Sequence, residues 1–491
     1  MMQAGDRIKD YEIWGRVGGG GMSDVWLARH VTLAVPLIVK TLRSDLGGDE
    51  DRFSRLMNEA RLMARVRSHR VVRAIDLGIT NETPYLVQEY IDGIDVNEID
   101  KRRRRALGLG LPLWFVSEVI GDVAQGLHAA HQTGVIHRDV KPSNVFFSPG
   151  LGIKLGDFGI ATAKGATPGS EISGTLSFMA PEALRGEPLD RRADIFALGA
   201  TAYDLRYGRS PFVDEPVAVR ARQPVAPVFP PAKSSEEAFF QHVLAKMMSP
   251  EAEHRFHDLN EPRRAFTTLA SMSMRTLPVT RALDGSLFAG GTKIVCEVGD
   301  IAQVRVDGIV SSASPDLVVG TTVGEALSKA AGPAFVDEAI ATGRHPLGSC
   351  VVTGAGSLPC RKVIHAVSAW LEVSCIARAV QRALLAAEEE GLHSLALPAL
   401  GTGTAKVSLE ASASAQASSL RWHLALGGTR LREVRFVLLT EEKLRVFREV
   451  LECVLLDENN PARDEVGLAS EMPPNDVAIG STMLGPMPTD P

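Results

Sequence analysis

The chain has 491 residues, and its 53 Lys and Arg against 59 Asp and Glu leave a formal net charge of −6 at pH 7. This balance gives no overall indication of binding to nucleic acid or to an anionic membrane. No stretch reaches the ~18 consecutive apolar residues of a membrane span, and the first residues lack an apolar run of signal-peptide length. We therefore expect a cytoplasmic protein of two or three domains that binds neither nucleic acid nor membrane.

From about residue 11 to residue 270 the sequence predicts a small β-rich lobe followed by a larger helical lobe. Strands are expected at YEIWGRV, VWLARH, LIVKTL and YLVQEYI, and helical patterns dominate afterwards. A glycine-rich turn, VGGGGMSDVW at residues 17–26, joins the first two strands. Taken alone, this turn is equally well interpreted as a flexible hairpin.

Further motifs in a fixed order change that interpretation. LIVK ends in Lys40, VIHRDVKPSNVFF contains Asp139, IKLGDFGIA contains Asp157, and FMAPEAL contains Glu182. The set resembles the eukaryotic-like serine/threonine protein kinases of bacteria, over nearly all of residues 11–270. The resemblance implies a bilobal α+β protein-kinase fold.

The resemblance also implies a reaction, the transfer of the γ-phosphoryl group of ATP to Ser or Thr side chains of protein substrates. This chemistry depends on positioning and charge neutralisation. The implied catalytic residues are Asp139, which would accept the hydroxyl proton, Lys141, Lys40 and Glu59, and Mg²⁺ would be held by Asn144 and Asp157. The implied ATP-binding residues are Val17, Gly18, Gly20, Ser23, Val25, Ile38, Lys40, Glu89 and Ile91.

Arg138, directly before Asp139, is similar to the arginine of kinases whose activation loop is ordered by a phosphate. Asp194 and Arg255 match the family's structural aspartate and the arginine that pairs with Glu182. The activation-loop residues implied by the resemblance are Thr162, Thr167, Ser170, Ser173 and Thr175.

Two residues depart from the kinase pattern. Ile38 stands where the family has a small residue above the adenine, and Gln88 occupies the gatekeeper position before the hinge. Both could narrow the nucleotide pocket, although neither removes a catalytic group. A pseudokinase scaffold is therefore the alternative to an active kinase.

The basic run KRRRR at residues 101–105 has acidic neighbours and no interleaved aromatic residues, so we expect a solvated loop or helix face rather than a nucleic-acid site. The five cysteines all lie in the second half of the chain, without CxxC pairs or a His at ligand spacing. They are expected to be reduced thiols that bind no metal.

Residues 271–292 lose periodicity and gather Ser, Thr, Gly and Pro, which predicts a linker. From about residue 293 to residue 455, short apolar strands alternate with helical patterns, which predicts an α/β domain. Residues 456–491, rich in Pro, acids and small residues, are predicted to be disordered. One helical face of the α/β domain is expected to carry Ile376, Val380, Ala383, Leu384 and Ala387.

Within this domain, LALPALGTGTAKVSL at residues 395–409 runs from an apolar strand into a glycine-rich turn. Such a turn either presents backbone N–H groups to an anion or is only a tight αβ connection. Three further features precede it: Asp300 after the strand KIVCEV, the loop GTTVG at residues 320–324, and His365 in KVIHAV. Their order and spacing resemble the macrodomain, over roughly residues 293–450, with a mixed central sheet.

Macrodomains bind ADP-ribose with its diphosphate between two glycine-rich loops, and an acid at the position of Asp300 accepts a hydrogen bond from the adenine amino group. The resemblance thus implies ADP-ribose or ADP-ribosylated proteins as partners. The implied ADP-ribose-binding residues are Asp300, Ile301, Ser314, Gly320, Thr321, Thr322, Val323, Gly324, Gly401, Thr402, Gly403, Thr404 and Ala405.

The departures from this second family concern catalysis. Macrodomains that remove ADP-ribose from proteins commonly have Asn-Ala-Ala-Asn where this chain has Ser311–Ser314, and a GGGV loop, often followed by an acid, where it has GTTVG. Without that asparagine or acid, hydrolysis has no obvious catalyst. A binding module is therefore the favoured interpretation, with an ADP-ribosyl hydrolase and a ligand-free scaffold as alternatives.

Overall fold

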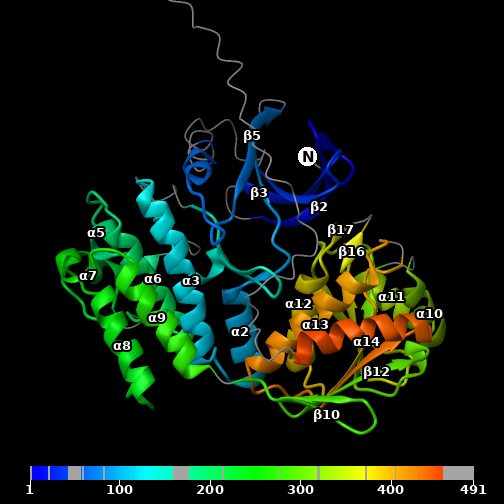
Figure 1. The fold of residues 1–491 in the computed structure, drawn as a ribbon. Coiled ribbons are helices and arrows are strands. Elements are labelled where there is room, and N and C mark those ends of the chain that lie inside the picture. Colours follow the sequence, from blue (N-terminus) through cyan, green and yellow to red (C-terminus); the bar gives the residue numbers. More distant parts are fainter. Residues whose placement is uncertain are drawn as a thin grey trace, which may run out of the picture.

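The structure is a computed structural model, and it describes residues 3–19, 23–42, 57, 60–80, 83–158, 176–212, 215–274, 276–317, 321–370, 373–403 and 405–456. A β-rich lobe stands above a helical lobe, and an α/β domain lies beside both (Figure 1). The predicted disordered tail, residues 456–491, lies outside the described residues except for Leu456, which ends a helix. No helix in the described ranges is both long and apolar enough to cross a membrane.

The β-rich lobe contains a six-stranded antiparallel sheet in the order β1-β2-β3-β4-β6-β5. The expected strands are all present, and Ile13, Val39 and Val87 share one hydrophobic cluster, while the neighbours Trp14 and Leu86 are buried in clusters on the opposite face of the sheet. The strands are β1 (Arg7–Ile8), β2 (Tyr11–Gly19), β3 (Ser23–His30), β4 (Pro36–Leu42), β5 (Ala74–Thr80) and β6 (Thr83–Glu89).

The helical lobe is built around the long helix α3 (Leu113–Gln132), which is apolar on nearly every side because other helices surround it. A small sheet next to it is formed by β7 (Ile94–Asp95), β8 (Val145–Ser148) and β9 (Gly152–Leu155). The other elements are α2 (Val96–Leu107), η2 (Pro142–Asn144), α5 (Pro181–Leu184), α6 (Arg192–Tyr207), α7 (Val217–Arg222), α8 (Ser235–Met247), η3 (Ala252–His254) and α9 (Asn260–Ser273).

The α/β domain has an eight-stranded mixed sheet in the order β10-β11-β12-β19-β18-β13-β15-β14. The five central strands from β12 to β15 are parallel, and β10, β11 and β14 add antiparallel at the edges. The strands of this sheet are β10 (Val279–Arg281), β11 (Leu287–Ala289), β12 (Thr292–Val298), β13 (Gly308–Ser312), β14 (Cys350–Gly354), β15 (Lys362–Ala366), β18 (Ser394–Pro398) and β19 (Glu433–Leu438). A separate hairpin is formed by β16 (Ala369–Trp370) and β17 (Val373–Ser374).

Helices cover both faces of this sheet, because successive strand residues point to opposite sides. Ile309 packs with α10 (Thr322–Ala331) and α11 (Pro333–Ala341), whereas its neighbour Val310 packs on the opposite face. That opposite face is covered by α12 (Ile376–Glu389), α13 (Leu409–Ala425) and α14 (Glu441–Leu456), while the short helix η4 (Ile301–Gln303) follows β12. The predicted fold class is confirmed.

The predicted linker is too long. Of residues 271–292, the first three still belong to α9, and strands β10 and β11 form one edge of the α/β sheet. The low periodicity of this segment reflects short edge strands joined by a tight turn, because such strands bury few side chains. The sequence therefore predicts the start of the α/β domain, at residue 293, too late, because the sheet already includes β10 from Val279.

The two domains meet along helices α2 and α12, which lie side by side (Figure 1). Glu98 on α2 binds the Arg382 guanidinium through both oxygens, at 2.8 and 2.7 Å. Arg102 binds Glu389 in the same bidentate way, at 3.1 and 2.6 Å. Paired guanidinium–carboxylate contacts of this kind fix the orientation of both side chains.

The expectation of a solvated basic face at residues 101–105 is wrong for its central arginines. Arg103 is only 1% exposed, and it donates to the carbonyl oxygens of Leu426 and Gly427 at 3.2 and 2.9 Å. Arg104 pairs with Asp100 at 2.7 Å. The basic run lies on a helix, as one of the two expected forms, but this helix is covered by the second domain.

An aromatic cluster strengthens the contact between the domains. Trp422, on α13, is 6% exposed and packs among the rings of Trp114, Phe115 and Phe147 of the helical lobe. Its ring stacks on Trp114 with 5.6 Å between centroids and meets Phe147 edge-on at 4.8 Å. A residue of the α/β domain thus completes the core of the helical lobe.

Candidate functional sites

The first site is built on the loop that carries Asp139. Asp194 of α6 is fully buried and accepts hydrogen bonds from the backbone N–H groups of His137 and Arg138, both at 2.8 Å. These bonds hold Arg138 at φ 69°, in the left-handed region that non-glycine residues seldom adopt. The buried His137 ring contacts the Gly156 carbonyl at 2.9 Å, and burial lowers the pKa of His137.

Asp139 is placed by its two predicted partners. Lys141 lies 2.8 Å from its carboxylate, and Asn144 donates from Nδ2 to the carbonyl oxygen and to Oδ2 of Asp139, at 2.8 and 3.0 Å. A carboxylate beside an ammonium in a fixed loop can accept a proton from a substrate hydroxyl. The amide oxygen of Asn144 remains available as an acceptor, because both hydrogen bonds to Asp139 use the amide nitrogen.

Asp157 faces this group from the loop after β9. The Lys40 ammonium forms an ion pair with Asp157 Oδ1, and Lys40 itself is buried. Burial raises the pKa of the Asp157 carboxyl, but the charge and hydrogen bond of Lys40, together with the nearby His137 and Lys141, outweigh burial, so the pKa lies below its usual value. The carboxylate is ionised near neutral pH.

The oxygens of Asn144 and Asp157 fit a magnesium ion, which takes one or two protein oxygens and completes its shell with nucleotide phosphates and water. Bound there, the ion would neutralise phosphate charge. Among the described residues, no three His, Cys, Asp or Glu side chains gather as a metal cage.

The supporting ion pair of the helical lobe is also in place. Arg255 is 4% exposed and binds Glu182 through two nitrogens, at 2.6 and 2.8 Å. It donates further to the carbonyl oxygens of Ser249, Pro250 and Arg192. The pair therefore ties the segment around α5 to the end of the lobe.

The predicted nucleotide-binding residues lie on β2, β3, β4 and the end of β6. Gly18 is the register partner of Val25, and Val25 is the register partner of Lys40. Ile38 pairs with Gln88, directly before the hinge residues Glu89–Ile91. Several predicted residues lie outside the described residues: Gly20, Glu59, Thr162, Thr167, Ser170, Ser173 and Thr175. For Ser23 the described part is its backbone position at the start of β3.

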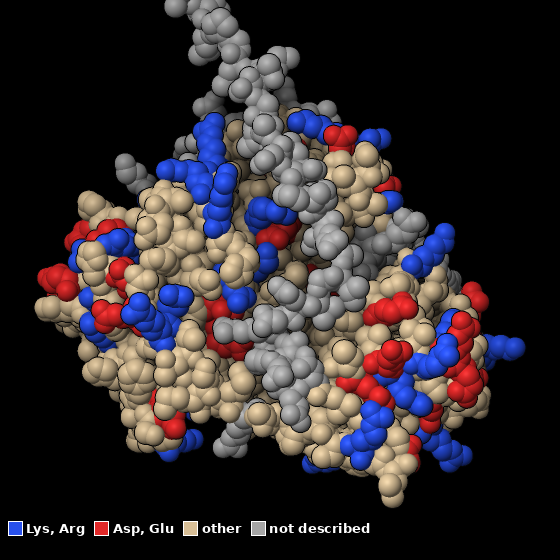
Figure 2. Space-filling model, in the orientation of Figure 1, with Lys and Arg blue, Asp and Glu red and all other residues tan. Residues whose placement is uncertain are grey.

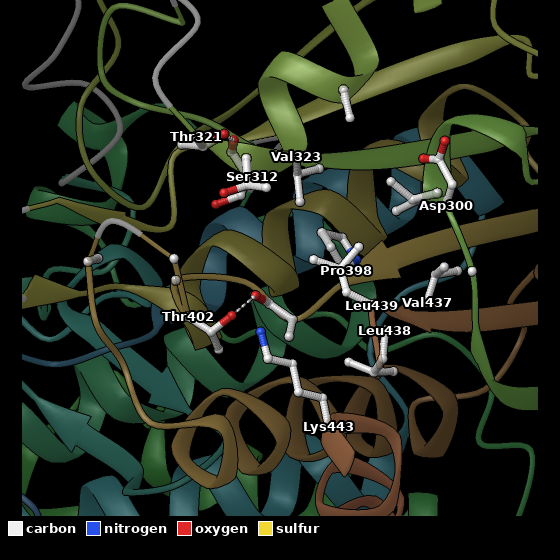
Figure 3. Close-up of a pocket in the computed structure, with 18 of the residues that line it drawn as sticks. Asp300, Ser312, Thr321, Val323, Pro398, Thr402, Val437, Leu438, Leu439 and Lys443 are labelled. Carbon is white, nitrogen blue, oxygen red and sulfur yellow. Dashed lines mark hydrogen bonds between the residues drawn. The ribbon is translucent and has the colours of Figure 1, made fainter. Parts of the chain in front are cut away.

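The second site is a pocket at the carboxyl ends of β13, β18 and β19 (Figure 3). Asp300 caps η4, because its Oδ1 accepts from the Ala302 N–H at 3.0 Å. Thr321 caps α10 by accepting from the Gly324 N–H at 2.9 Å, and it donates to the Ser312 carbonyl at 2.7 Å. This bond fixes the start of α10 to the end of β13.

The glycine-rich turn after β18 forms another wall of the pocket. Gly401 has φ 77°, a conformation that glycine adopts without strain, and its carbonyl accepts from the Val407 N–H at 3.1 Å. The Thr402 hydroxyl donates to the Ala399 carbonyl at 2.9 Å, as Figure 3 shows. The turn is thereby closed on itself next to the pocket.

Most of the predicted ADP-ribose-binding residues line this pocket: Asp300, Ile301, Ser314, Thr321, Thr322, Val323, Gly401, Thr402, Gly403 and Ala405. Gly324 is the exception, since its N–H is used within the cap of α10. Gly320 and Thr404 lie outside the described residues.

The sequence reasoning missed the contribution of β18, β19 and α14. Pro398 ends β18 and Ala399 follows it. Val437 and Leu438 end β19, and Lys443 extends from α14 toward the pocket near Thr402 (Figure 3). The parallel pairing of β18 with β19 puts both strand ends at one edge of the sheet. An apolar strand followed by an acidic helix start, VRFVLLTEEK, was the available signal.

Comparison with known proteins identifies both domains. The protein kinase domain family matches residues 11–260, and the macro domain family matches residues 310–416. The first domain is thus a protein kinase domain and the second a macrodomain. With half of its length matched by the protein kinase domain, the chain belongs to the protein kinase family.

Curated relatives resemble the first domain. Serine/threonine-protein kinase PknB of Mycolicibacterium smegmatis is 33% identical over 270 residues, which cover 52% of this chain and 42% of that protein. Serine/threonine-protein kinase Pkn1 of Myxococcus xanthus is 32% identical over 286 residues, covering 55% of this chain and 40% of that protein. The chain thus spans less than half the length of these relatives.

Among solved structures, the PknI kinase domain of Mycobacterium tuberculosis is 26% identical. It covers 55% of this chain and 100% of its own, with a TM-score of 0.45.

Proposed function

We propose that the chain is an ATP- and Mg²⁺-dependent serine/threonine protein kinase. The observation that supports this most strongly is the convergence of Asp139, Lys141 and Asn144 with the Asp157–Lys40 ion pair. In this proposal Asp139 accepts the substrate proton, Lys40 and Lys141 offset phosphate charge, and Asn144 and Asp157 hold the metal. Ser and Thr side chains of proteins, including those of its own activation loop, are the acceptors.

The test is phosphate transfer by the full chain from labelled Mg-ATP to itself and to a generic protein substrate. We expect Asp139→Ala to reduce transfer at least 100-fold, because the proton acceptor is lost. Asp190→Ala, which removes an exposed carboxylate of the same domain, should leave phosphate transfer unchanged. ATP-dependent thermal stabilisation of the wild-type chain without any transfer would contradict the proposal and favour the pseudokinase scaffold.

We further propose that the macrodomain binds ADP-ribose or ADP-ribosylated proteins. Support comes from the pocket, where glycine-rich backbone lies near Lys443 and Asp300 lies at the opposite end (Figure 3). Backbone N–H groups and an ammonium favour a diphosphate, and a carboxylate favours an amino group such as that of adenine. Among the described lining residues Asp300 is the one carboxylate, and its Oδ1 already accepts a hydrogen bond, so the pocket supports binding better than hydrolysis.

Calorimetric titration of ADP-ribose into the full chain tests this second proposal. We expect Asp300→Ala to weaken binding at least tenfold, whereas Asp337→Ala, an exposed position on α11, leaves it unchanged. The full chain is used because Trp422 is buried in the kinase domain and an isolated macrodomain would expose it. Release of ADP-ribose from a modified protein would instead establish a hydrolase, and no heat would favour the ligand-free scaffold.

A further inference from the structure

The segment that ends β13 belongs to two sites at once. Ser312 and Ser314 line the macrodomain pocket. Ala313 and Leu317, in the same segment, are buried in a hydrophobic cluster that also contains Trp14 and Leu27 of the kinase domain. We call this the shared cluster; it consists of Trp14, Leu27, Ala313, Leu317, Ala339, Leu347, Val367 and Cys375.

On the kinase side, the shared cluster adjoins the proposed nucleotide site. Val17, which precedes the glycine-rich turn, and Ile38, on β4, both pack against it. Leu27 of β3 is the register partner of Ile38 of β4, so a cluster residue and the proposed adenine roof lie side by side on adjacent strands. A displacement of the shared cluster would therefore also displace Val17 and Ile38, which are proposed to enclose the nucleotide.

Leu317 is held in an unfavourable conformation. Its φ of 52° lies in the left-handed region, which is unfavourable for a residue other than glycine. Its side chain is nevertheless 8% exposed, within the shared cluster. Leu317 thus combines an unfavourable backbone conformation with burial in a cluster that includes Trp14 and Leu27 of the kinase domain, and its segment also borders the ligand pocket.

A second contact joins the macrodomain to the hinge. Helix α12 has no capping side chain of its own, and Asp92 of the kinase domain accepts from the N–H groups of Ala377 and Arg378 at 3.0 and 2.9 Å. Asp92 directly follows the hinge residue Ile91, and Tyr90 packs against the shared cluster. The orientation of the hinge is thus tied to the macrodomain.

The contact between β2 and the macrodomain encloses unfilled space. A cavity lies between Trp14–Gly18 on β2 and a macrodomain wall formed by Pro315 and Arg344–Leu347. Two arginines line this cavity, and each forms an ion pair within its own domain: Arg16 with Asp24 and Arg344 with Asp316. Because the cavity borders the shared cluster, the β13 segment can shift without a clash at this side.

We propose that Ala313 and Leu317 are positioning residues, through which a ligand in the macrodomain pocket changes the affinity of the kinase domain for ATP. The proposal rests on the function proposed above for both sites. A ligand shifts another site only if it binds two arrangements of the intervening segment differently, and the resulting coupling is reciprocal. ADP-ribose touching Ser312 and Ser314 would select one arrangement of the segment that packs on Trp14 and Leu27.

The test measures both affinities in the full chain by calorimetry. A non-hydrolysable ATP analogue with Mg²⁺ is titrated with and without saturating ADP-ribose, and ADP-ribose is titrated with and without the analogue. We expect each ligand to change the affinity of the other at least threefold, by the same factor in both directions.

Two variants identify the route. Leu317→Ala removes a side chain of the shared cluster outside the pocket, and it should bring the coupling factor close to one while both ligands still bind. Leu358→Ala is the matched control, because Leu358 is equally buried in the macrodomain but packs in a different cluster, away from the kinase domain. It should leave the factor unchanged.

Each contrary result has a distinct meaning. If both ligands bind and neither changes the affinity of the other, the coupling is overturned while the two proposed functions stand. If ADP-ribose or the analogue gives no heat, the function proposed for that site fails and the coupling fails with it. If Leu358→Ala abolishes the coupling as completely as Leu317→Ala, the route through the shared cluster is overturned.

Discussion

Asp92 supplies a charge to a helix that lies in another domain. Its carboxylate meets the amino end of α12, where backbone N–H groups and the helix dipole favour an anion. Burial nevertheless raises the pKa of the Asp92 carboxyl to about 6, despite these hydrogen bonds. The ionised residue therefore costs folding free energy near neutral pH, which is consistent with a role in positioning the hinge rather than in stability.

This raised pKa predicts how stability depends on pH. The native state holds the proton of Asp92 up to about pH 6, whereas the unfolded chain releases it near pH 4. The contribution of Asp92 is therefore fully present below about pH 4 and is lost as the pH rises through 6. We expect Asp92→Asn to gain of the order of 1–3 kcal/mol relative to wild type between pH 4 and 7, measured by urea unfolding. An equal pH dependence in both proteins would contradict the raised pKa.

Lys443 is the one cation among the described residues that line the macrodomain pocket. Because its ammonium points toward the pocket near the glycine-rich turn, we expect Lys443→Ala to weaken ADP-ribose binding about three- to tenfold (Figure 3). The loss should shrink at high salt, since the contact is exposed and screened. Lys329→Ala, an exposed lysine on α10 outside the pocket, is the control for net charge. Equal losses in the two variants would rule out a local contact.

At the scale of elements, α2 and α12 form the contact between the domains. The Glu98–Arg382 pair is well covered, with side chains 21% and 17% exposed, and it is bidentate. Pairs in this setting are stronger than exposed ones, because solvent screens them less and both hydrogen bonds are directed. The opposite charges thus set the register of the two helices.

A double-mutant cycle on Glu98→Ala and Arg382→Ala tests that role. We expect a coupling energy of about 1–3 kcal/mol in the free energy of unfolding. The Asp316–Arg344 pair, whose side chains are 50% and 57% exposed, serves as the comparison and should give less than ~1 kcal/mol. If the two cycles return the same value, the interface pair does not fix the helices.

Burial on α2 and α12 could be predicted only in part from the sequence. The periodicity of α12 correctly predicts the buried face of Ile376, Val380 and Ala383. It does not predict that Ala377 and Leu385 on other faces are buried too, because the covering helix α2 lies far away in the sequence. For the same reason the sequence predicts a solvated basic run at residues 101–105, although Arg103 is buried.

Some parts of the two candidate sites could be predicted from the sequence and others could not. The loops around Asp139 and Gly401 leave clear marks, since their backbone and chemistry require particular residue types. The run VRFVLLTEEK predicts a strand followed by a helix, but the place of Lys443 and of the end of β19 in the pocket depends on strand order rather than on local pattern. The shared cluster, to which Leu317 and Trp14 both belong, depends on the packing of two domains and has no local signature.

At the scale of the whole molecule, the domains share apolar cores as well as ion pairs. Trp422 lies in the core of the helical lobe, and the shared cluster draws on both domains. Contacts between domains that are small and polar permit relative motion, whereas apolar contacts couple the domains. Figure 2 shows acidic and basic side chains interspersed over the macrodomain side of the visible face, without one dominant charge.

We therefore expect the full chain to unfold in one calorimetric transition, with calorimetric and van't Hoff enthalpies that agree. Trp422→Ala should lower the stability by about 3–5 kcal/mol through the cavity it leaves between the domains. It should also split the transition in two, because one of the two apolar links between the domains is lost. Two separate transitions in the wild-type chain would show that the domains are energetically independent.

The position of Trp422 also has a consequence for synthesis on the ribosome. The pocket formed by Trp114, Phe115 and Phe147 is made early, but the side chain that fills it belongs to a much later part of the chain. At roughly 5–20 residues per second, the delay between the end of the kinase domain and Trp422 is about 10–30 s. During that time the nascent kinase domain has an open aromatic pocket, so it reaches its final form only after the macrodomain has emerged.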